Sequence, residues 1–155
     1  MAVNIDPIFT YYVRTNKVAS ITAANTNSDG SGTISTDIFK VFGAFATDGS
    51  FIKMLRFYAT STVAATTTVP TTMRIFISTA TSGATTSSNT YLWEEVSIPV
   101  VSADHSTSST NYYEIPMGFA LPPGNTILVT SHVAPAANTS WCVMAVTGDY
   151  KENPL

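Results

Sequence analysis

The alternation of apolar and polar residues within short segments is the feature that most constrains this fold. Apolar residues rarely recur at the i, i+3, i+4, i+7 spacing of a helix, and Thr, Val, Ile, Tyr and Phe dominate segments bounded by Gly, Pro, Asn, Asp and Ser. Met73, Ile75 and Ile77 share one face of such a segment, and so do Ile127 and Val129. The pattern predicts an all-β protein.

About eight antiparallel strands are expected. They lie near Ser20–Asn25, Thr33–Ala46, Phe51–Thr62, Thr71–Thr79, Thr90–Val100, Tyr112–Leu121, Thr126–Val133 and Trp141–Thr147. This number is typical of a single β-sandwich of jelly-roll type. We expect the sandwich to span residues 19–150, after an N-terminal arm (1–18) and before a frayed tail (151–155). Four polar segments, at 26–32, 63–72, 80–89 and 101–110, are expected to be surface loops.

Two of these strands carry local irregularities. Ile52, Leu55 and Phe57 reach one face only if a bulge lies near Lys53–Met54. Pro116 lacks an N–H for a strand ladder, which predicts an edge or bulged strand at that position.

Charge is scarce in this chain, and hydroxyl groups replace it. Charged residues are 11% of the sequence, against roughly 25% in an ordinary soluble domain, while 25 Thr and 17 Ser are present. A net charge of −3 gives no global attraction to nucleic acid or to an anionic membrane. No apolar run reaches the roughly 18 residues of a transmembrane helix, and the first residues lack the features of a secretory signal. We therefore expect neither nucleic acid nor a membrane as a partner.

Titratable groups for catalysis are few and scattered. His105 and His132 lie far apart in sequence, and no Gly-x-Ser-x-Gly elbow is present. Glu94 and Glu95 are adjacent on a predicted strand, so they point to opposite faces and do not form a glycosidase pair. The sequence predicts a protein that is not an enzyme and that uses no cofactor.

The string Asn25–Gly30 imitates the first half of a calcium loop. Its twelfth position is Thr36, where an EF-hand requires a bidentate Glu, and its flanks resemble strands. The same residues suit a tight turn with a positive φ at Gly30, which is the favoured interpretation, and calcium is the alternative. One cysteine and two separated histidines give no zinc set, and Cys142 is expected to be buried and unreactive.

Four aromatic residues, Tyr91, Trp93, Tyr112 and Trp141, have two possible roles. Aromatic side chains on strands usually belong to a core or a subunit interface, and this is the favoured role. Alternatively they stack on a glycan. Basic residues do not interleave with them, which argues against a nucleic-acid groove.

A series of short motifs from Ile21 to Tyr150 resembles a family of small virion proteins of tailed phages and prophages. The motifs are, in order, Ile21-Thr22-Ala23-Ala24-Asn25-Thr26, Asp29-Gly30-Ser31-Gly32-Thr33, Gly49-Ser50, Arg56-Phe57-Tyr58-Ala59-Thr60, Arg74-Ile75-Phe76-Ile77, Leu92-Trp93-Glu94-Glu95, Ile98-Pro99-Val100, Leu121-Pro122-Pro123-Gly124, Ser131-His132 and Gly148-Asp149-Tyr150. Segments 63–72 and 80–89 are longer than is usual in the family, and residues 1–18 lie outside the match.

The resemblance implies a structural component of the phage particle, and no catalytic residue is carried over. The role it favours is a capsid decoration (cement) protein, a homotrimer that binds the major capsid protein on the virion surface after synthesis in the host cytoplasm. The N-terminal arm is apolar and aromatic, and we expect it to contact the capsid or a neighbouring subunit through Ile5, Ile8, Phe9, Tyr11, Tyr12 and Val13. The alternative is a tail- or fibre-associated protein that binds a host glycan through the four aromatic residues.

Overall fold

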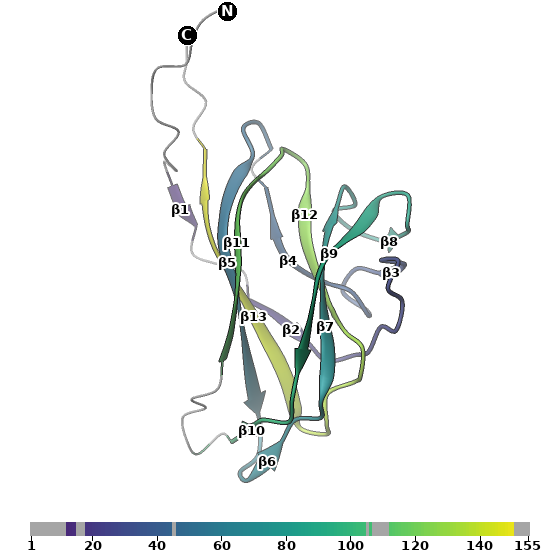
Figure 1. Cartoon of the computed structure of the whole chain (residues 1–155), viewed down its shortest axis with the longest axis vertical. Coiled ribbons are helices and arrows are strands. Elements are labelled where there is room, and N and C mark those ends of the chain that lie inside the picture. Colours follow the sequence, from purple (N-terminus) through teal and green to yellow (C-terminus); the bar gives the residue numbers. More distant parts are fainter. Residues whose placement is uncertain (1–11, 15–17, 45, 105, 107–111, 151–155) are drawn as a thin grey trace, which may run out of the picture.

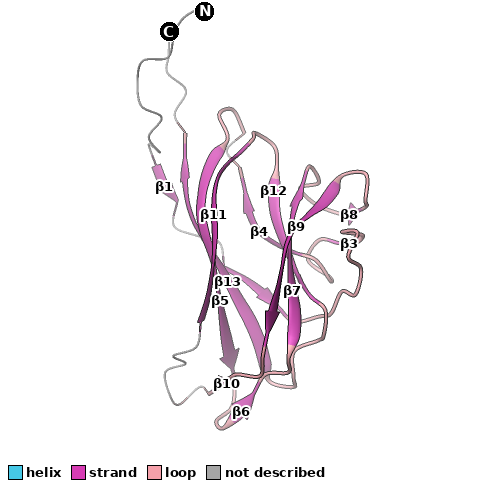
Figure 2. Ribbon diagram, in the orientation of Figure 1, coloured by secondary structure: helices cyan, strands magenta, loops and turns pink. Residues whose placement is uncertain are grey.

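The computed structural model describes residues 12–14, 18–44, 46–104, 106 and 112–150, which form strands and no helix (Figures 1 and 2). The strands are β1 (Tyr12–Arg14), β2 (Val18–Ile21), β3 (Gly32–Thr33), β4 (Phe39–Gly43), β5 (Ser50–Ser61), β6 (Thr66–Thr67), β7 (Thr71–Ser78), β8 (Ala84–Thr85), β9 (Thr90–Ile98), β10 (Ser102–Ala103), β11 (Tyr112–Leu121), β12 (Thr126–Ser131) and β13 (Thr139–Asp149). The described residues include no helix long and apolar enough to cross a membrane.

One layer of the molecule is a five-stranded antiparallel sheet. Its path is β1-β13-β5-β11, and β2 also pairs with β13. The long strand β13 therefore lies inside the sheet, with β5 along one side and with β2 and β1 end to end along the other. β11 pairs only with β5, so it forms the opposite edge.

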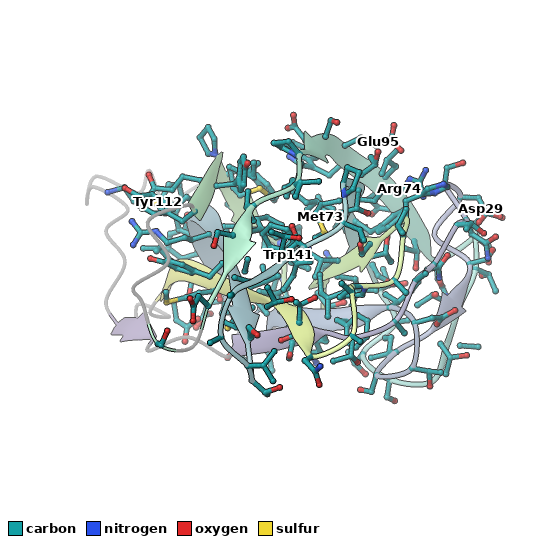
Figure 3. All side chains as sticks on the ribbon, turned by 90° about the horizontal axis from the view of Figure 1, so that it is seen from below. Asp29, Met73, Arg74, Glu95, Tyr112 and Trp141 are labelled. Carbon is teal, nitrogen blue, oxygen red and sulfur yellow. The ribbon has the colours of Figure 1, made fainter. Side chains whose placement is uncertain are left out.

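The second layer is a four-stranded antiparallel sheet in the order β4-β12-β7-β9. Side chains from both layers meet in one apolar core, which includes Met73 and Ile75 of β7 and Phe57 and Trp141 of the five-stranded sheet. Met73 and Trp141 lie in the middle of the molecule in Figure 3. The two sheets thus form a β-sandwich, and the expected all-β class is confirmed.

The expected number of about eight strands is not confirmed, because several short strands lie where loops were predicted. Segment Thr33–Ala46 is not one strand: Ser35, at a φ of 72°, lies in a turn that separates β3 from β4. The four polar segments pair in twos. β3 pairs with β8, and β6 pairs with β10. Alternation within each segment carries no information about these contacts between loops.

Both predicted irregularities are confirmed. The register of β5 with β13 shifts between Ile52 and Met54, which leaves Lys53 as the extra residue, and Ile52, Leu55 and Phe57 are all fully buried. Pro116 lies on the edge strand β11, at the start of a second register shift.

A second, smaller core covers the outer face of the four-stranded sheet. Phe76 of β7 and Leu128 of β12 point away from the main core and pack against Ile34 and Ile38, which belong to the connection from β2 to β4. Pairing of β3 with β8 holds this connection against the loop that follows β7. The protein's own polar segments therefore cover this face.

Candidate functional site

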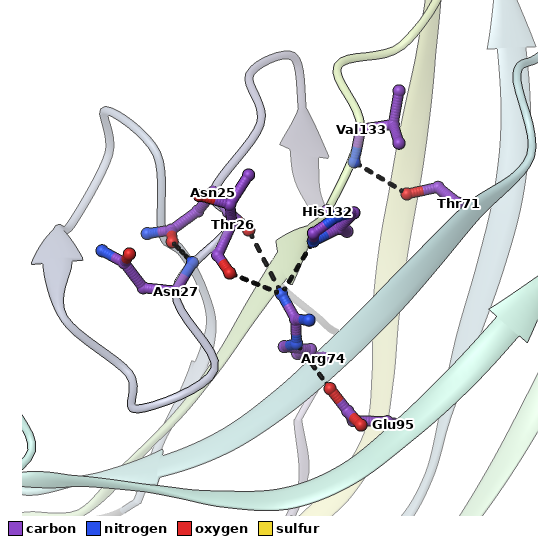
Figure 4. A network of polar contacts seen from close by, with 8 residues as sticks. All are labelled: Asn25, Thr26, Asn27, Thr71, Arg74, Glu95, His132 and Val133. Carbon is purple, nitrogen blue, oxygen red and sulfur yellow. Dashed lines mark hydrogen bonds and ion pairs between the residues drawn. The ribbon is translucent and has the colours of Figure 1, made fainter.

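Arg74 is the centre of a polar network on the covered side of the sandwich (Figure 4). It lies on β7 in an otherwise apolar strand, and its side chain is only 10% exposed. Its Nε donates to Glu95 of β9 at 2.5 Å, while its Nη1 lies 3.3 Å from the carbonyl of Thr26 and 3.5 Å from that of Asn25. The guanidinium is thus held by a carboxylate on one side and by the β2–β4 connection on the other.

The exposed imidazole of His132 completes the network. Its Nδ1 lies 3.3 Å from Arg74 Nη1, which as part of a guanidinium can only donate. Backbone bonds fix the same segment: the N–H of His132 donates to Thr72, and that of Asn25 donates to the carbonyl of Ser131. All of these contacts join segments of the fold to one another. The network therefore anchors the connection from β2 to β4, which we call the covering loop.

The string Asn25–Gly30 forms a tight turn, as favoured. The Asn25 side chain accepts from the N–H of Asn27, and Asp29 accepts from both the N–H and the hydroxyl of Ser31. These bonds lower the pKa of Asp29 below its ordinary value. Gly30 has a φ of +80°, as predicted. Within the described ranges no group of three His, Cys, Asp or Glu side chains is placed to hold a metal ion.

The candidate acid–base residues do not converge. Glu95 lies opposite Arg74 on the covered face, whereas Glu94 lies opposite Ile75, whose side chain faces the main core. The two carboxylates therefore point to different sides of β9, as predicted. His132 belongs to the network above, and His105 lies outside the described residues.

The outer face of the five-stranded sheet differs from the covered side of the sandwich. Alternation places a set of half-buried or exposed side chains there: Ser20, Met54, Arg56, Tyr58, Tyr112, Glu114, Cys142, Met144 and Val146. We call this set the open face. No described residue forms a second core over it, in contrast to the four-stranded sheet.

Arg56 organises the centre of the open face. Its guanidinium carbon lies 4.7 Å from the ring centroid of Tyr112 and 5.9 Å from that of Tyr58, and it forms an ion pair with Glu114. The two tyrosine rings are 5.7 Å apart. Strand register explains the cluster, because Arg56 lies directly opposite Glu114 and Tyr58 opposite Tyr112. The cation is paired within the face, which leaves the cluster close to neutral.

Cys142 also lies on the open face, opposite Tyr58. We expected the Cys142 thiol to be buried, but the side chain points outward from β13 and is only half-buried. This partial burial nevertheless raises the pKa of the thiol.

The four predicted aromatic residues do not form one site. Trp141 is fully buried in the main core, so the suggestion that it stacks on a glycan is wrong, and its core role is confirmed. Tyr112 is 48% exposed on the open face. Tyr91 and Trp93 both lie on β9, and Trp93 contacts Phe119 of β11. Phe119 is seven positions along β11 from Tyr112, which corresponds to about 23 Å at the ordinary strand rise.

The predicted arm is described only at its end. Tyr12 and Val13 belong to β1, whose backbone pairs with Gly148 and Asp149 of β13, so this part of the arm is a strand of the sheet. Ile5, Ile8, Phe9 and Tyr11 lie outside the described residues, as does the predicted tail at 151–155.

Sequence reasoning did not identify either arginine as an organising residue. The available signal was an arginine at a strand position flanked by apolar residues, as in Met73-Arg74-Ile75 and Leu55-Arg56-Phe57. A buried cation requires a partner, but the partners Glu95 and Glu114 become apparent only once strand order and register are known.

Comparison of the chain with protein-family models, with curated proteins and with solved structures finds no match.

Proposed function

We propose that this protein is a non-enzymatic structural component of a tailed-phage virion, a capsid decoration (cement) protein that stabilises the major capsid shell. In this proposal it is made in the bacterial host cytoplasm and binds the capsid surface as a homotrimer. The order of phage-like motifs along the chain supports the particle assignment. The observation that carries the role within the particle is the open face.

The finer fold assignment in this proposal is a jelly roll. Eight main strands follow one another along the chain as β2, β4, β5, β7, β9, β11, β12 and β13. Numbered one to eight, they run 1-8-3-6 in one sheet and 2-7-4-5 in the other. This order supports the jelly roll, the double Greek key found in viral capsid domains among others, as the finer assignment.

The composition of the open face suits contact with another protein. Tyr, Met and Arg are enriched in the buried centres of protein interfaces, and the open face has two of each of the first two types and one arginine. The charge of Arg56 is already balanced by Glu114, so a partner that covers the face leaves no single charge unpaired. Such a face favours a neutral protein surface as its partner.

Repetition on a lattice strengthens such a contact. Even with Thr60, Pro116 and Ser140, which the register places on the same side, the open face has fewer residues than the roughly 20–30 that each partner contributes to a standard interface, so one contact of this size is weak. A capsid presents many equivalent positions, and simultaneous engagement by linked copies raises the overall affinity by orders of magnitude. A trimer on a shell provides such linkage.

Co-sedimentation with phage heads that lack the protein tests this proposal. We expect Met144→Glu, which adds an unpaired charge to the open face, to abolish co-sedimentation, while Thr81→Glu on an exposed loop binds as the wild type does. Equal binding by both variants would refute the role of the open face. Immunogold labelling of virions gives the location of the protein. Label over the whole head supports the decoration role, whereas label at the tail tip would refute it in favour of the tail-associated alternative.

A further inference from the structure

Three consecutive exposed residues on β9 form the densest group of exposed large hydrophobic side chains in the described part of the chain. Tyr91 is 54% exposed, Leu92 40% and Trp93 46%. The other large hydrophobic residues of comparable exposure occur singly along the sequence. Isolated exposed hydrophobic residues are ordinary, but a contiguous group that includes two aromatic rings is typical of a binding surface.

A bulge in β9 places both rings on the same side of the strand. Tyr91 lies opposite Ile77 and Glu94 lies opposite Ile75, so these two residues are on the core-facing side, and Trp93 is the extra residue between them. The Trp93 ring packs against Phe119 of β11, with ring centroids 4.5 Å apart. Because β9 and β11 are edge strands of the two sheets, this contact lies along one side of the sandwich, between the two edge strands. Tyr91, Trp93 and Glu94 are therefore neighbours along this edge.

The arrangement is rigid before any ligand arrives. β9 is paired with β7 on both sides of the bulge, and the indole of Trp93 packs against Phe119. Aromatic rings with few rotatable bonds and a packed neighbour lose little conformational entropy when they bind. A pre-positioned flat surface of this kind suits a flat ligand.

The charge beside the rings limits the class of ligand. Glu94 is exposed and forms no ion pair or side-chain hydrogen bond within the described ranges, whereas Glu95 is engaged by Arg74. A single free carboxylate accepts hydrogen bonds from hydroxyl groups and repels anions. Anions are therefore disfavoured, and a neutral ligand with an apolar face and several hydroxyl groups can engage both the rings and the carboxylate.

A partner β-strand fits this edge poorly. The bulge at Trp93 interrupts the regular spacing that a new strand would need, and two adjacent glutamates lie in the middle of β9. Bulges and charges are the devices that protect sheet edges from added strands. The rings are thus available for a ligand that does not require the backbone.

We propose that Tyr91, Trp93 and Glu94 form a binding site for a neutral hexose residue of a polysaccharide. The C–H face of the sugar stacks on the two rings, and the Glu94 carboxylate accepts hydrogen bonds from its hydroxyl groups. This site is separate from the open face and does not depend on the capsid proposal, because it uses different residues, and Phe119, which packs against Trp93, is seven positions along β11 from Tyr112.

Titration of the full-length chain with methyl β-galactopyranoside, followed by NMR, tests the site. We expect saturable shifts at resonances of β9, weak binding by a single sugar, and at least tenfold weaker binding of galacturonate, because of repulsion by Glu94. Trp93→Ala should remove binding of the neutral sugar. Glu94→Gln should bring the affinities for the two sugars closer together. Tyr112→Ala is the matched control, because Tyr112 is as exposed as Trp93 but lies on the open face.

Two outcomes would overturn this proposal. One is the absence of saturable shifts with methyl β-galactopyranoside, methyl β-glucopyranoside and methyl α-mannopyranoside alike. The other is an equal loss of binding in Tyr112→Ala and Trp93→Ala. Capsid co-sedimentation of Trp93→Ala separates the two proposals, since we expect that variant to bind heads normally.

Discussion

Replacement of Arg74 by methionine tests whether the polar network anchors the covering loop. Methionine keeps much of the aliphatic volume of the arginine stem and removes the guanidinium. The substitution therefore breaks the bond to Glu95 and the three longer contacts to Asn25, Thr26 and His132. Packing in the strand is little changed.

The expected loss follows from the geometry. Hydrogen bonds to charged groups contribute about 1.5–3 kcal/mol when short, but three of these contacts are 3.3–3.5 Å long, so each is worth less. The pair with Glu95 adds less than about 1 kcal/mol, because the carboxylate is 44% exposed and screened by water. Removing a nearly buried charge recovers some desolvation energy. We expect a net loss of about 2 kcal/mol.

Urea unfolding followed by tryptophan fluorescence measures this loss, and Arg56→Met is the matched control. Both arginines pair with a glutamate across neighbouring strands, but the Arg56 side chain is 30% exposed against 10% for Arg74. We expect a clear fall in the urea midpoint for Arg74→Met and little change for Arg56→Met. Amide exchange should accelerate at residues 25–38 in the first variant alone. A midpoint for Arg74→Met within error of the wild type would refute the anchoring role.

Three further predictions concern single positions. Burial raises the pKa of the Cys142 thiol, so its alkylation by iodoacetamide should reach its half-maximal rate at a higher pH in the folded chain than in the urea-unfolded chain. The associated stability is present below the unfolded pKa and is lost as the pH rises through the folded pKa, and the same half-maximal pH in both states would contradict this. Trp141→Ala should cost about 3–5 kcal/mol in urea unfolding, because the side chain is fully buried, and a loss below about 1 kcal/mol would show that the core refills. Gly30→Ala should lower the melting temperature more than Gly83→Ala does. Both glycines have a positive φ, but a Cβ added at Gly30 would lie 2.6 Å from the Thr90 side chain, whereas one added at Gly83 meets no atom within 4 Å. Equal effects of the two substitutions would count against a role for the Thr90 contact.

Local features of this fold were predictable from sequence, and contacts between segments were not. The bulge at Lys53 and the edge position of Pro116 follow from side-chain alternation and from a missing N–H, both of which act within one strand. Pairing of β3 with β8 joins segments about fifty residues apart that have no strand-like alternation. The adjoining residues Ile34 and Ile38 cover Phe76 and Leu128, a contact between distant segments that no local pattern reveals.

The two tryptophans show the same limit within the candidate site. Trp93 and Trp141 both lie on predicted strands, and each has a polar residue on one side, so sequence alone gave them the same two possible roles. β13 lies inside its sheet and Trp141 is fully buried, whereas β9 is an edge strand on which Trp93 is the extra residue of a bulge and stays 46% exposed beside Phe119. Strand order decides between the roles, and strand order depends on long-range pairing.

The interior position of β13 determines when this chain can fold. β2 pairs with residues more than a hundred positions later in the sequence, and β5 also needs β13 along its length. During synthesis β2 has no sheet partner, and β5 has only β11, until β13 has left the ribosome, so the five-stranded sheet forms only after translation of nearly the whole chain. Such distant pairings make folding slow, in the range of milliseconds to seconds. Until β13 pairs with it, one edge of the apolar strand β5 stays exposed, and a chaperone that binds extended hydrophobic segments would protect it from aggregation during that time.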